Sequence, residues 1–462
     1  MTESSSSGGL TPYIVFVALV AASGGLLFGY DLGVTGGVTS MPDFLALFFP
    51  AIAVAHGGAP PSASREVQYC LFDDQGLQLF TSSLYLAGTA STLLGSFTSR
   101  HWGRRATMLL AGACFLAGVV LCAAASALAM LIVGRIMLGL GVGFANQAVP
   151  VYLSEMAPTR LRGGLNIMFQ LATTTGILVA QLVNYGTHQI PGWGWRLSLA
   201  AAGLPALVLL VGAVFLPDSP ASLAARGHAD RARAVLKRVR GRGCDIEKEW
   251  ADIAAAREFA LQAGNPWRLL FSKGYRAELL VGASVAFFSQ INGINAILFY
   301  APVIFTTLGA SQQAALLSAI AVGGTMVAGT VVSLLLVDRA GRRPLLIQGG
   351  LQMLAAEVTV GGLLATGSGG LSRERAEGLL AMFCVFAAGF AWSWGPLGWL
   401  IPSEIQPLET RSAGQSFATA VNFMVAFAIG QSFLATLCAM RWGTFLFYGA
   451  FVAAMTAAAR PQ

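Results

Sequence analysis

The chain has 462 residues, of which 55% are hydrophobic and 11% are charged. Soluble domains carry about 25% charged residues, so most of this chain cannot face water. Its net charge of +7 would suggest a nucleic-acid partner in a soluble protein. In a chain this apolar, the excess of Lys and Arg on the cytoplasmic side of membrane proteins explains it better. We therefore expect an all-α membrane protein in contact with the lipid bilayer, without nucleic acid.

Twelve apolar segments are long enough to cross a bilayer, which takes about 17 to 25 residues. After a Ser- and Gly-rich start at residues 1–11, which we expect to be disordered, the predicted spans are residues 12–33, 76–98, 106–126, 128–151, 163–185, 195–216, 276–306, 313–336, 344–366, 376–401, 412–436 and 442–459. Twelve spans put both termini on one side of the membrane. Most of the 28 Lys and Arg residues fall in loops on that side, which predicts that both termini are cytoplasmic.

Two loops are longer than the others and set the expected domain boundaries. Residues 34–75 are predicted to lie outside the cell. Residues 217–275 connect the sixth and seventh spans in the cytoplasm, and their charged, amphipathic pattern predicts helices. These helices are either a solvated connector or a brace against both bundles. The expected domains are a six-helix half at 12–216, this linker, and a second six-helix half at 276–459.

A pair of basic loops occurs twice, about half a chain apart. Each copy holds a Gly-Arg-Arg turn, at 103–105 and 341–343, and then a Ser-Glu with an Arg seven residues beyond the Glu. This duplication predicts two homologous halves, as in alternating-access transporters. If these loops only set the orientation of the chain in the membrane, positive charge alone would be enough. The repeated Glu therefore favours a second role, as latches between spans that stabilise an outward-facing state. The candidate latch residues are Arg104, Arg105, Glu155, Arg162, Asp338, Arg339, Arg342, Arg343, Glu404 and Arg411.

Charge inside a predicted span is costly and is usually functional, and three such residues stand out. Asp31 lies near the outer end of the first span, and Arg135 opens the fourth. Both belong to one half, so they can meet and lower each other's desolvation cost. Such a pair is either a static ion pair or, as we favour, a carboxylate whose protonation decides whether it holds Arg135. Glu357 in the ninth span has no evident partner.

Side-chain amides recur in apolar surroundings, and each carries both hydrogen-bond donors and acceptors. They are Gln170, Gln181, Gln290, Asn292, Asn295 and Asn422. Such amides either join helices, which we favour for Gln181 and Asn292, or match the hydroxyls of a sugar. Gly293 permits a helix break that turns Gln290 and Asn295 inward together.

Trp394 is a candidate for stacking on a sugar ring. It precedes the helix-breaking pair Gly395-Pro396 near the middle of the tenth span. Its flat apolar face suits a sugar, although a lone aromatic residue more often packs against its neighbours.

The remaining reactive residues indicate one disulfide and no catalytic chemistry. Of six cysteines, three lie within spans and one in a cytoplasmic loop. Cys70 and Cys438 are the two at the external face, where oxidation is permitted, so they form the one plausible disulfide. No metal-ligand cluster, catalytic triad or phosphate-binding loop is evident. We therefore expect neither an enzyme nor a bound metal or cofactor.

These motifs together resemble the sugar porter family of the major facilitator superfamily, and most of all the plant monosaccharide/proton symporters. The likeness runs from about Tyr13 to Met455. It rests on FGYDLGVTGGV, GRIMLGLGVGFANQAVPVYLSEMAPTRLRG, the FQL of the fifth span, GINAILFYAPV, DRAGRR and WGPLGWLIPSEI. The resemblance implies a bundle of twelve helices in two six-helix halves. It also implies cotransport of a hexose with a proton at the plasma membrane.

The resemblance also implies roles for individual residues. It assigns proton coupling to Asp31 and Arg135, and to Cys70 and Cys438 a disulfide that closes an extracellular lid. The residues that it assigns to sugar binding are Gln170, Gln290, Asn295, Trp394 and Asn422.

The chain departs from the family pattern at four places. Ser289 stands where the family usually has a Gln, and Met326 where it usually has an Asn, so two amide ligands for the sugar are lost. Glu357 stands in place of an uncharged residue. The chain ends in AAARPQ without the Pro-Glu-Ser/Thr-x-Gly tail of the family, as expected of a truncated gene.

We therefore expect a monosaccharide importer driven by protons, with one chain as the functional unit. Two alternatives stay open. One is a facilitator, or a polyol or inositol symporter, on the same scaffold. The other is a sugar sensor that does not transport. Uptake of labelled hexose in a cell without its own transporters distinguishes all three.

Overall fold

The computed structural model of the chain describes residues 11–58, 70, 72–158, 162–241, 245–307, 311–365, 373–407 and 409–459. All regular secondary structure in these residues is helical. Each of the twelve predicted spans falls on one helix or on two consecutive helices. In chain order these are α1 (Pro12–Val38), α5 (Gln75–His101), α6 (Arg104–Ala123), α7 (Leu128–Met156), α8 (Arg162–Thr187), α9 and α10 (Gly194–Ala201 and Gly203–Phe215), α15 and α16 (Arg276–Ile291 and Ile294–Thr307), α17 (Gln312–Ala340), α18 (Arg342–Ala365), α19 and α20 (Arg373–Trp392 and Trp394–Ile405), α21 (Arg411–Met440) and α22 (Gly443–Ala458).

Nine helical stretches of the described residues are both long enough and apolar enough to cross a membrane. The other predicted spans correspond to α5, α18 and α22. The first two are long, but they carry several Ser, Thr and Gln side chains or charges, and α22 has 16 residues. α5 and α18 therefore depend on packing against their neighbours more than on their own hydrophobicity, whereas α22 is apolar but short.

Side-chain caps fix where several long helices begin. The hydroxyl of Thr11 accepts from the backbone N–H of Ile14 at 3.2 Å, directly before Pro12 at the start of α1. Asp74 caps α5, accepting from the N–H of Leu77 at 2.9 Å. A capping oxygen satisfies one of the free N–H groups of the first helical turn, and Pro at the first position loses nothing because its N–H would be unpaired.

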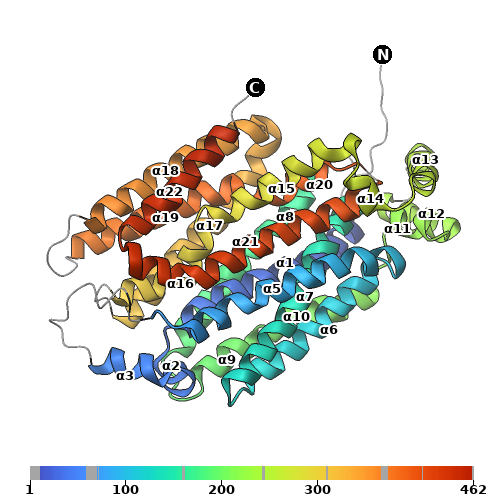
Figure 1. Ribbon diagram of the computed structural model, residues 1–462. Helices are drawn as coiled ribbons and strands as arrows, with labels where there is room; N and C mark the ends of the chain where they lie inside the picture. Colours follow the sequence, from blue (N-terminus) through green and yellow to red (C-terminus); the bar gives the residue numbers. More distant parts are fainter. Residues whose placement is uncertain are drawn as a thin grey trace.

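The long helices run side by side as one bundle (Figure 1). The start of α1 and the end of α22 lie at one end, which we call the terminal end. The predicted outer loop contains two short helices, α2 (Pro42–Phe48) and α3 (Pro50–Gly58). They lie at the opposite end, which we call the disulfide end.

The linker between the sixth and seventh spans is helical, as its charge pattern predicted. It contains α11 (Pro220–Ala225), α12 (Ala229–Arg240), α13 (Glu247–Ala263), α14 (Pro266–Leu270) and a 3₁₀ turn, η2 (Lys273–Tyr275). Arg240 pairs with Glu249 at 2.5 Å and donates to the carbonyls of Met156 and Ala157 at 2.8 and 3.1 Å. Because carbonyls at the C-terminus of a helix lack partners within it, these bonds dock the linker onto the end of α7.

Corresponding helices of the two parts of the chain make corresponding contacts. In the first part, α1 to α10, helices α5 and α6 both pack on α7; in the second, α15 to α22, helices α17 and α18 both pack on α19. The two parts meet along two seams, α5 with α21 and α8 with α17. In chain order α5 corresponds to α17 and α8 to α21, so each seam is the image of the other. This is the symmetry that the duplicated loops predicted.

Three glycines bring α1 close to α8. Gly25, Gly29 and Gly33 are spaced four apart, so they share one face of the helix. A Cβ added at any of them would overlap a backbone carbonyl of α8. Small residues at this spacing let helix backbones approach closely within a membrane. The position of α1, which carries Asp31, is therefore set by contact between backbones.

We predict that Gly29→Ala destabilises the protein, because the new methyl group would collide with the carbonyl of Thr173. Overpacking of this kind costs roughly 1–3 kcal/mol. Gly324→Ala on α17 is the matched control, since nothing lies within 4 Å of a Cβ at that position. Thermal unfolding in detergent should show a lower Tm for Gly29→Ala alone. Equal Tm values for the two variants would contradict the tight α1–α8 contact.

Candidate functional site

A fully buried ion pair joins α1 to α7. Nη1 of Arg135 donates to Oδ1 of Asp31 at 2.6 Å, and the two residues are only 1% and 2% exposed. Arg135 also donates from Nε to the carbonyl of Phe80 at 3.0 Å and lies over the Phe80 ring, 4.9 Å from its centre. Removing one partner of a buried pair leaves an uncompensated charge, which costs about 3–5 kcal/mol. The two charges therefore hold each other in place, as the sequence suggested.

Four polar side chains form a hydrogen-bonded chain in the second part of the bundle. Nδ2 of Asn295 donates to Oε1 of Gln290 at 2.5 Å, and Nε2 of Gln290 donates to Oδ1 of Asn422 at 3.0 Å. Asn422 in turn donates to the hydroxyl of Ser289 at 3.0 Å. These residues come from α15, α16 and α21. Three of the four amides predicted to bind a sugar, those of the second part, are thus brought together and bond to one another.

The predicted helix break at Gly293 is present and separates α15 from α16. Gly293 has φ of 85°, in the left-handed region that favours glycine. Asn292 closes the break with its side chain. It donates to the carbonyls of Phe288 and Ser289 at 3.1 and 3.0 Å, and its Oδ1 accepts from the N–H of Ile294 at 3.0 Å. Asn292 therefore has the structural role that we favoured for it, and it holds Gln290 and Asn295 on either side of the break.

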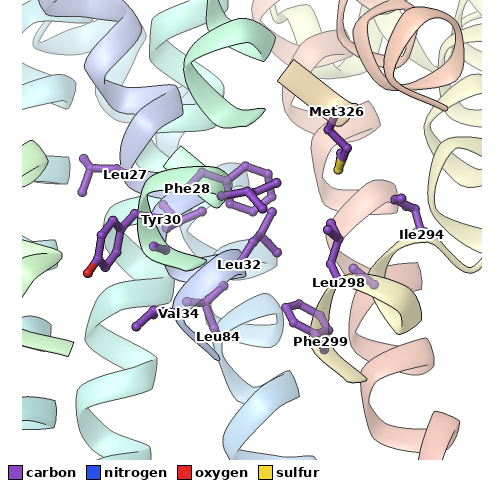
Figure 2. Close-up of a cluster of buried hydrophobic side chains, with 14 of the residues drawn as sticks. Leu27, Phe28, Tyr30, Leu32, Val34, Leu84, Ile294, Leu298, Phe299 and Met326 are labelled. Carbon is purple, nitrogen blue, oxygen red and sulfur yellow. The ribbon is translucent and has the colours of Figure 1, made fainter. Parts of the chain in front are cut away.

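A small cavity lies between the two parts of the bundle. Its lining residues come from α1, α8, α15, α16, α17, α19 and α20, namely Phe28, Leu32, Gln170, Thr173, Ile177, Ser289, Gln290, Ile294, Asn295, Leu298, Met326, Phe390, Gly395 and Trp399. Figure 2 shows Phe28 and Leu32 on one side, facing Ile294, Leu298 and Met326 on the other. Oε1 of Gln170 has no hydrogen-bond partner among the described residues. Two of the four departures from the family pattern, Ser289 and Met326, line this cavity.

The cavity is nearly closed. Its volume is about 30 Å³, close to the volume that one water molecule occupies in the liquid, whereas pockets for small ligands have roughly 300–1,000 Å³. Hydrogen bonds between the two parts of the bundle close it on both sides. Asn166 donates to Ser403 at 2.7 Å toward the terminal end, and Ser82 donates to Gln431 at 2.7 Å toward the disulfide end. A larger ligand enters only after the helices move.

The tryptophan that lines the cavity is Trp399, and not Trp394, which the sequence had suggested. Trp394 lies outside the cavity, 2% exposed, and its indole N–H donates to the carbonyl of Leu346 at 3.0 Å. Trp399 contacts the rings of Phe28 and Phe169 edge-on and lines the cavity. A sequence signal existed, because Trp399 is four residues after Gly395 and therefore shares its helix face.

The two Gly-Arg-Arg turns fold alike. Gly103 and Gly341 have φ of 93° and 84°, so both lie in the left-handed region where a side chain would be strained. Each glycine ends one helix and lets its first Arg begin the next. Arg104 thus begins α6 and Arg342 begins α18.

The first Arg of each turn pairs with the repeated Glu. Arg104 donates to Glu155 at 2.8 Å, joining α6 to α7, and Arg342 donates to Glu404 at 3.0 Å, joining α18 to α20. Arg342 also pairs with Asp338 at 3.2 Å. The Arg104–Glu155 side chains are 13% and 4% exposed, against 35% and 36% for Arg342–Glu404. Because water screens exposed pairs, the buried pair is the firmer tie.

The second Arg of each turn caps the last span of its part of the chain. Arg105 donates to the carbonyls of Ala213 and Val214 at 3.0 and 2.6 Å, at the end of α10. Arg343 donates to the carbonyl of Ala459 at 3.2 Å, just past the end of α22. Cations at these positions stabilise helix C-termini. The duplication therefore includes the function of both arginines.

The other candidate latch residues differ in their surroundings. Arg411 at the start of α21 lines a small cleft together with Arg104 and Glu155, so the second part of the chain reaches the charge pair of the first. Arg339 is exposed and forms no ion pair within the described residues. Arg162 begins α8, but its side chain lies outside the described residues.

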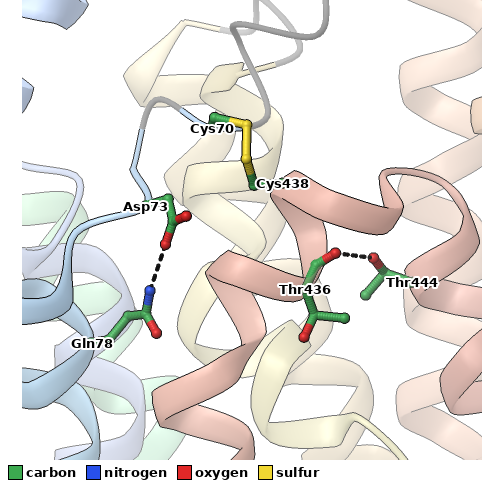
Figure 3. The surroundings of a disulfide bond; sticks show 6 residues. All are labelled: Cys70, Asp73, Gln78, Thr436, Cys438 and Thr444. Atoms are coloured by element: carbon green, nitrogen blue, oxygen red, sulfur yellow. Dashed lines mark hydrogen bonds between the residues drawn. A yellow bond between two sulfur atoms is a disulfide. The ribbon is translucent and has the colours of Figure 1, made fainter.

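A disulfide links Cys70, shortly before α5, to Cys438 near the end of α21, with Cα atoms 4.6 Å apart (Figure 3). Next to it, Nε2 of Gln78 donates to Asp73 at 2.8 Å and fixes the start of α5. The bond joins the two parts of the bundle along the α5–α21 seam. Residues 59–69 of the predicted outer loop lie outside the described residues.

Comparison with known proteins finds sugar transporters. Residues 17–459 match the family model described as sugar (and other) transporter. Sugar transport protein 13 of Arabidopsis thaliana is 52% identical over 452 residues, which cover 97% of this chain and 85% of that protein. The H(+)/hexose cotransporter 2 of Parachlorella kessleri is 52% identical over 455 residues, which cover 97% of this chain and 83% of that protein.

A solved structure supports the fold. XylE of E. coli, a major facilitator superfamily proton:xylose symporter bound to 6-bromo-6-deoxy-D-glucose, superposes with a TM-score of 0.82 and 27% identity, over 97% of this chain and 95% of that chain. The predicted major facilitator fold, with twelve helices in two pseudo-symmetric halves, is thereby confirmed. The family is one of transporters, so the expectation that the chain is not an enzyme is also confirmed.

We predict that alkylation of the unfolded, unreduced protein will label Cys114, Cys122 and Cys384, which are free in the structure, and not Cys70 or Cys438. Reduction before alkylation should make the last two reactive as well. Mass spectrometry of the labelled peptides measures both states. Labelling of Cys70 and Cys438 without reduction would contradict the disulfide.

Proposed function

Since the chain belongs to the family of sugar (and other) transporters, we propose that it imports a hexose with a proton across the plasma membrane by alternating access. One observation carries the proposal: α1 connects the buried pair to an amide-lined cavity, because Asp31 pairs with Arg135 and the next residue, Leu32, lines the cavity. The named activities of two relatives, a proton/hexose cotransporter and a proton:xylose symporter, support it.

The cavity suits a sugar because its polar groups both donate and accept hydrogen bonds. Gln290, Asn295 and Asn422 bond to one another in this closed state, so they exchange these bonds for bonds to hydroxyl groups when a sugar enters. Gln170 adds an acceptor from the first half. The indole of Trp399 offers an apolar face to the ring. A buried site built for hydroxyl groups rejects ligands that lack them, because its own polar groups would stay unpaired.

Asp31 binds the transported proton. Protonation removes the charge of Asp31 and with it most of the attraction to Arg135. Arg135 stays in place, because its guanidinium also donates to the carbonyls of Phe80 and Thr81 on α5. Asp31 is therefore the partner that moves, together with α1. Deprotonation toward the inside re-forms the pair and returns α1, which couples each sugar to one proton movement.

The charge networks of the terminal end act as the inner gate. Arg104–Glu155 and Arg342–Glu404 hold the helix ends of each half together, and Arg411 reaches from the second half to the pair of the first. When this end opens to the inside, the Arg411 contact is lost. The networks therefore favour the state that is closed to the cytoplasm and open to the outside.

The terminal end faces the cytoplasm. Basic residues gather in its loops, as expected for the inner side of a membrane protein, and the disulfide at the opposite end matches an oxidising exterior. The first half then spans 12–216, the cytoplasmic linker 217–275 and the second half 276–459. Each chain holds a complete cavity, so the monomer is the functional unit.

Uptake of radiolabelled hexose in a transport-null cell tests the proposal, and Asp31→Asn sharpens it. We expect the unsubstituted protein to accumulate hexose above the outside concentration and to lose this accumulation when a protonophore is added. Asp31→Asn mimics the protonated carboxyl, so it should abolish accumulation while hexose exchange and binding survive.

Competing sugars in the same assay define the substrate, with polyols and inositol included. Uptake that only equilibrates the sugar and ignores the protonophore would show a facilitator instead. Binding without uptake would show a sensor. Proton-driven accumulation that persists undiminished in Asp31→Asn would overturn the role of Asp31.

A matched pair of tryptophan variants tests which indole contacts the sugar. Trp399→Ala should raise the KM for uptake about tenfold, which corresponds to about 1.4 kcal/mol of lost binding. Trp394→Ala removes an indole that contacts backbone outside the cavity, so it should lower the Tm and leave KM close to that of the unsubstituted protein. The opposite assignment of the two effects would restore Trp394 as the stacking residue.

A further inference from the structure

Glu357 is a buried carboxyl group that the proposed transport cycle does not use. It lies within α18 and is 3% exposed. Its Oε2 is buried without a hydrogen-bond partner among the described residues, and the residue forms no ion pair there. Polar groups so deeply buried are almost always paired, so an unpaired one needs an explanation.

The carboxyl lies between the break in the seventh span and the last span. A Cβ placed on Gly293 would be 3.5 Å from Oε1 of Glu357, and one placed on Gly449 of α22 would be 3.5 Å from Oε2. Two glycines on different helices thus leave the space that the carboxyl fills. A side chain at Gly293 would press on Tyr448, whose Cγ would be 3.2 Å away, and would reach van der Waals contact with the carboxyl. The group therefore lies next to the break.

The charges around Glu357 do not compensate it. The titratable group that faces it is Tyr448 of α22. No described Lys, Arg or His of α15, α16, α17, α19, α20 or α22 forms an ion pair with it, although it is 3% exposed. A carboxylate moved into apolar surroundings without a partner is so unfavourable that such a group normally takes up a proton.

The break offers an alternative partner for the ionised form. Gly293 directly precedes α16, a helix of 14 residues, and the N-terminus of a helix stabilises an anion through its free N–H groups. In this structure Asn292 occupies the N–H of Ile294. A charged Glu357 would compete with Asn292 for the start of α16, and a neutral one would not.

We propose that Glu357 is a second proton-binding site, in the half opposite Asp31, and that its charge controls the geometry of the break and thereby the affinity for sugar. The inference rests on the proposed transport function. The step is a proton transfer alone: the neutral acid gives H⁺ to water and becomes a carboxylate. The neutral acid keeps the break packed, with Gln290 and Asn295 aligned. The carboxylate draws the start of α16 toward itself and moves Asn295 away from Gln290.

Infrared spectroscopy of the purified protein tests the proton site without any transport. By whole-residue exposure, Asp31 and Glu357 are the buried acidic residues of the described chain, and the largely buried side chain of Glu155 is paired with Arg104. In Asp31→Asn at neutral pH, the C=O stretching band of a protonated carboxyl group should remain. The band should disappear in the double variant Asp31→Asn/Glu357→Gln. It should remain in the control double variant Asp31→Asn/Glu374→Gln, which replaces an exposed Glu on α19. No band in Asp31→Asn, or a band that persists after Glu357→Gln, overturns the site.

Hexose exchange tests control of the break. In Asp31→Asn, exchange of labelled for unlabelled hexose across vesicles needs no net proton movement. The KM for exchange in Asp31→Asn should still rise several-fold as the pH is raised. Adding Glu357→Gln should abolish this rise, and adding Glu374→Gln should leave the rise unchanged. A KM profile that Glu357→Gln does not change overturns the control of affinity. Failure of the unsubstituted protein to exchange any hexose would instead refute the transport function, and the infrared bands would still decide on the proton site.

Discussion

The demand that buried charge be compensated organises the first half of the molecule. Arg135 cannot lie in an apolar bundle unless Asp31 and backbone carbonyls of α5 surround it, and Asp31 cannot reach it unless α1 comes close. The row of glycines on α1 lets its backbone pack closely against α8, which fixes the position of the helix that carries Asp31. Composition, helix packing and proton coupling are therefore linked: a bulkier residue on α1 would displace the carboxylate, and a missing carboxylate would leave the guanidinium uncompensated in a medium that cannot solvate it.

The second half meets the same membrane environment with interrupted helices instead of charge. Its seventh span breaks at Gly293 and its tenth at Ser393, where α19 gives way to α20. Irregular backbone is tolerated at membrane depth only where it is buried in protein or lines a cavity, and here the amide of Asn292 satisfies the freed groups. The breaks give Gln290 and Asn295 directions that a straight helix would not allow. One symmetric scaffold thus holds a buried ion pair in one half and most of the buried amides that line its cavity in the other.

The span count, the two halves and the partnership of Asp31 with Arg135 followed from the sequence, because costly intramembrane charges leave few possible partners. The equivalence of the two Gly-Arg-Arg turns was visible as well. Their second arginines were not recognised as caps for α10 and α22, because the sequence does not show which helix C-terminus lies close to a given side chain. The place of Trp394 outside the cavity could not be predicted, because a pattern places a residue on a helix but does not give the rotation of that helix after a break. For Glu357 the sequence showed the anomaly and no partner. Only the packed structure shows the two glycines that surround it.

The disulfide has a mechanical consequence. The halves meet along two equivalent seams, α5 with α21 and α8 with α17, but Cys70 and Cys438 tie only the first of them covalently. At that end of the molecule the α5–α21 seam becomes a hinge, and the α8–α17 seam, held by weaker bonds such as that of Gln313 to Tyr185, becomes the edge that swings. The helices are therefore arranged symmetrically but move asymmetrically, and the disulfide end opens along the α8–α17 seam.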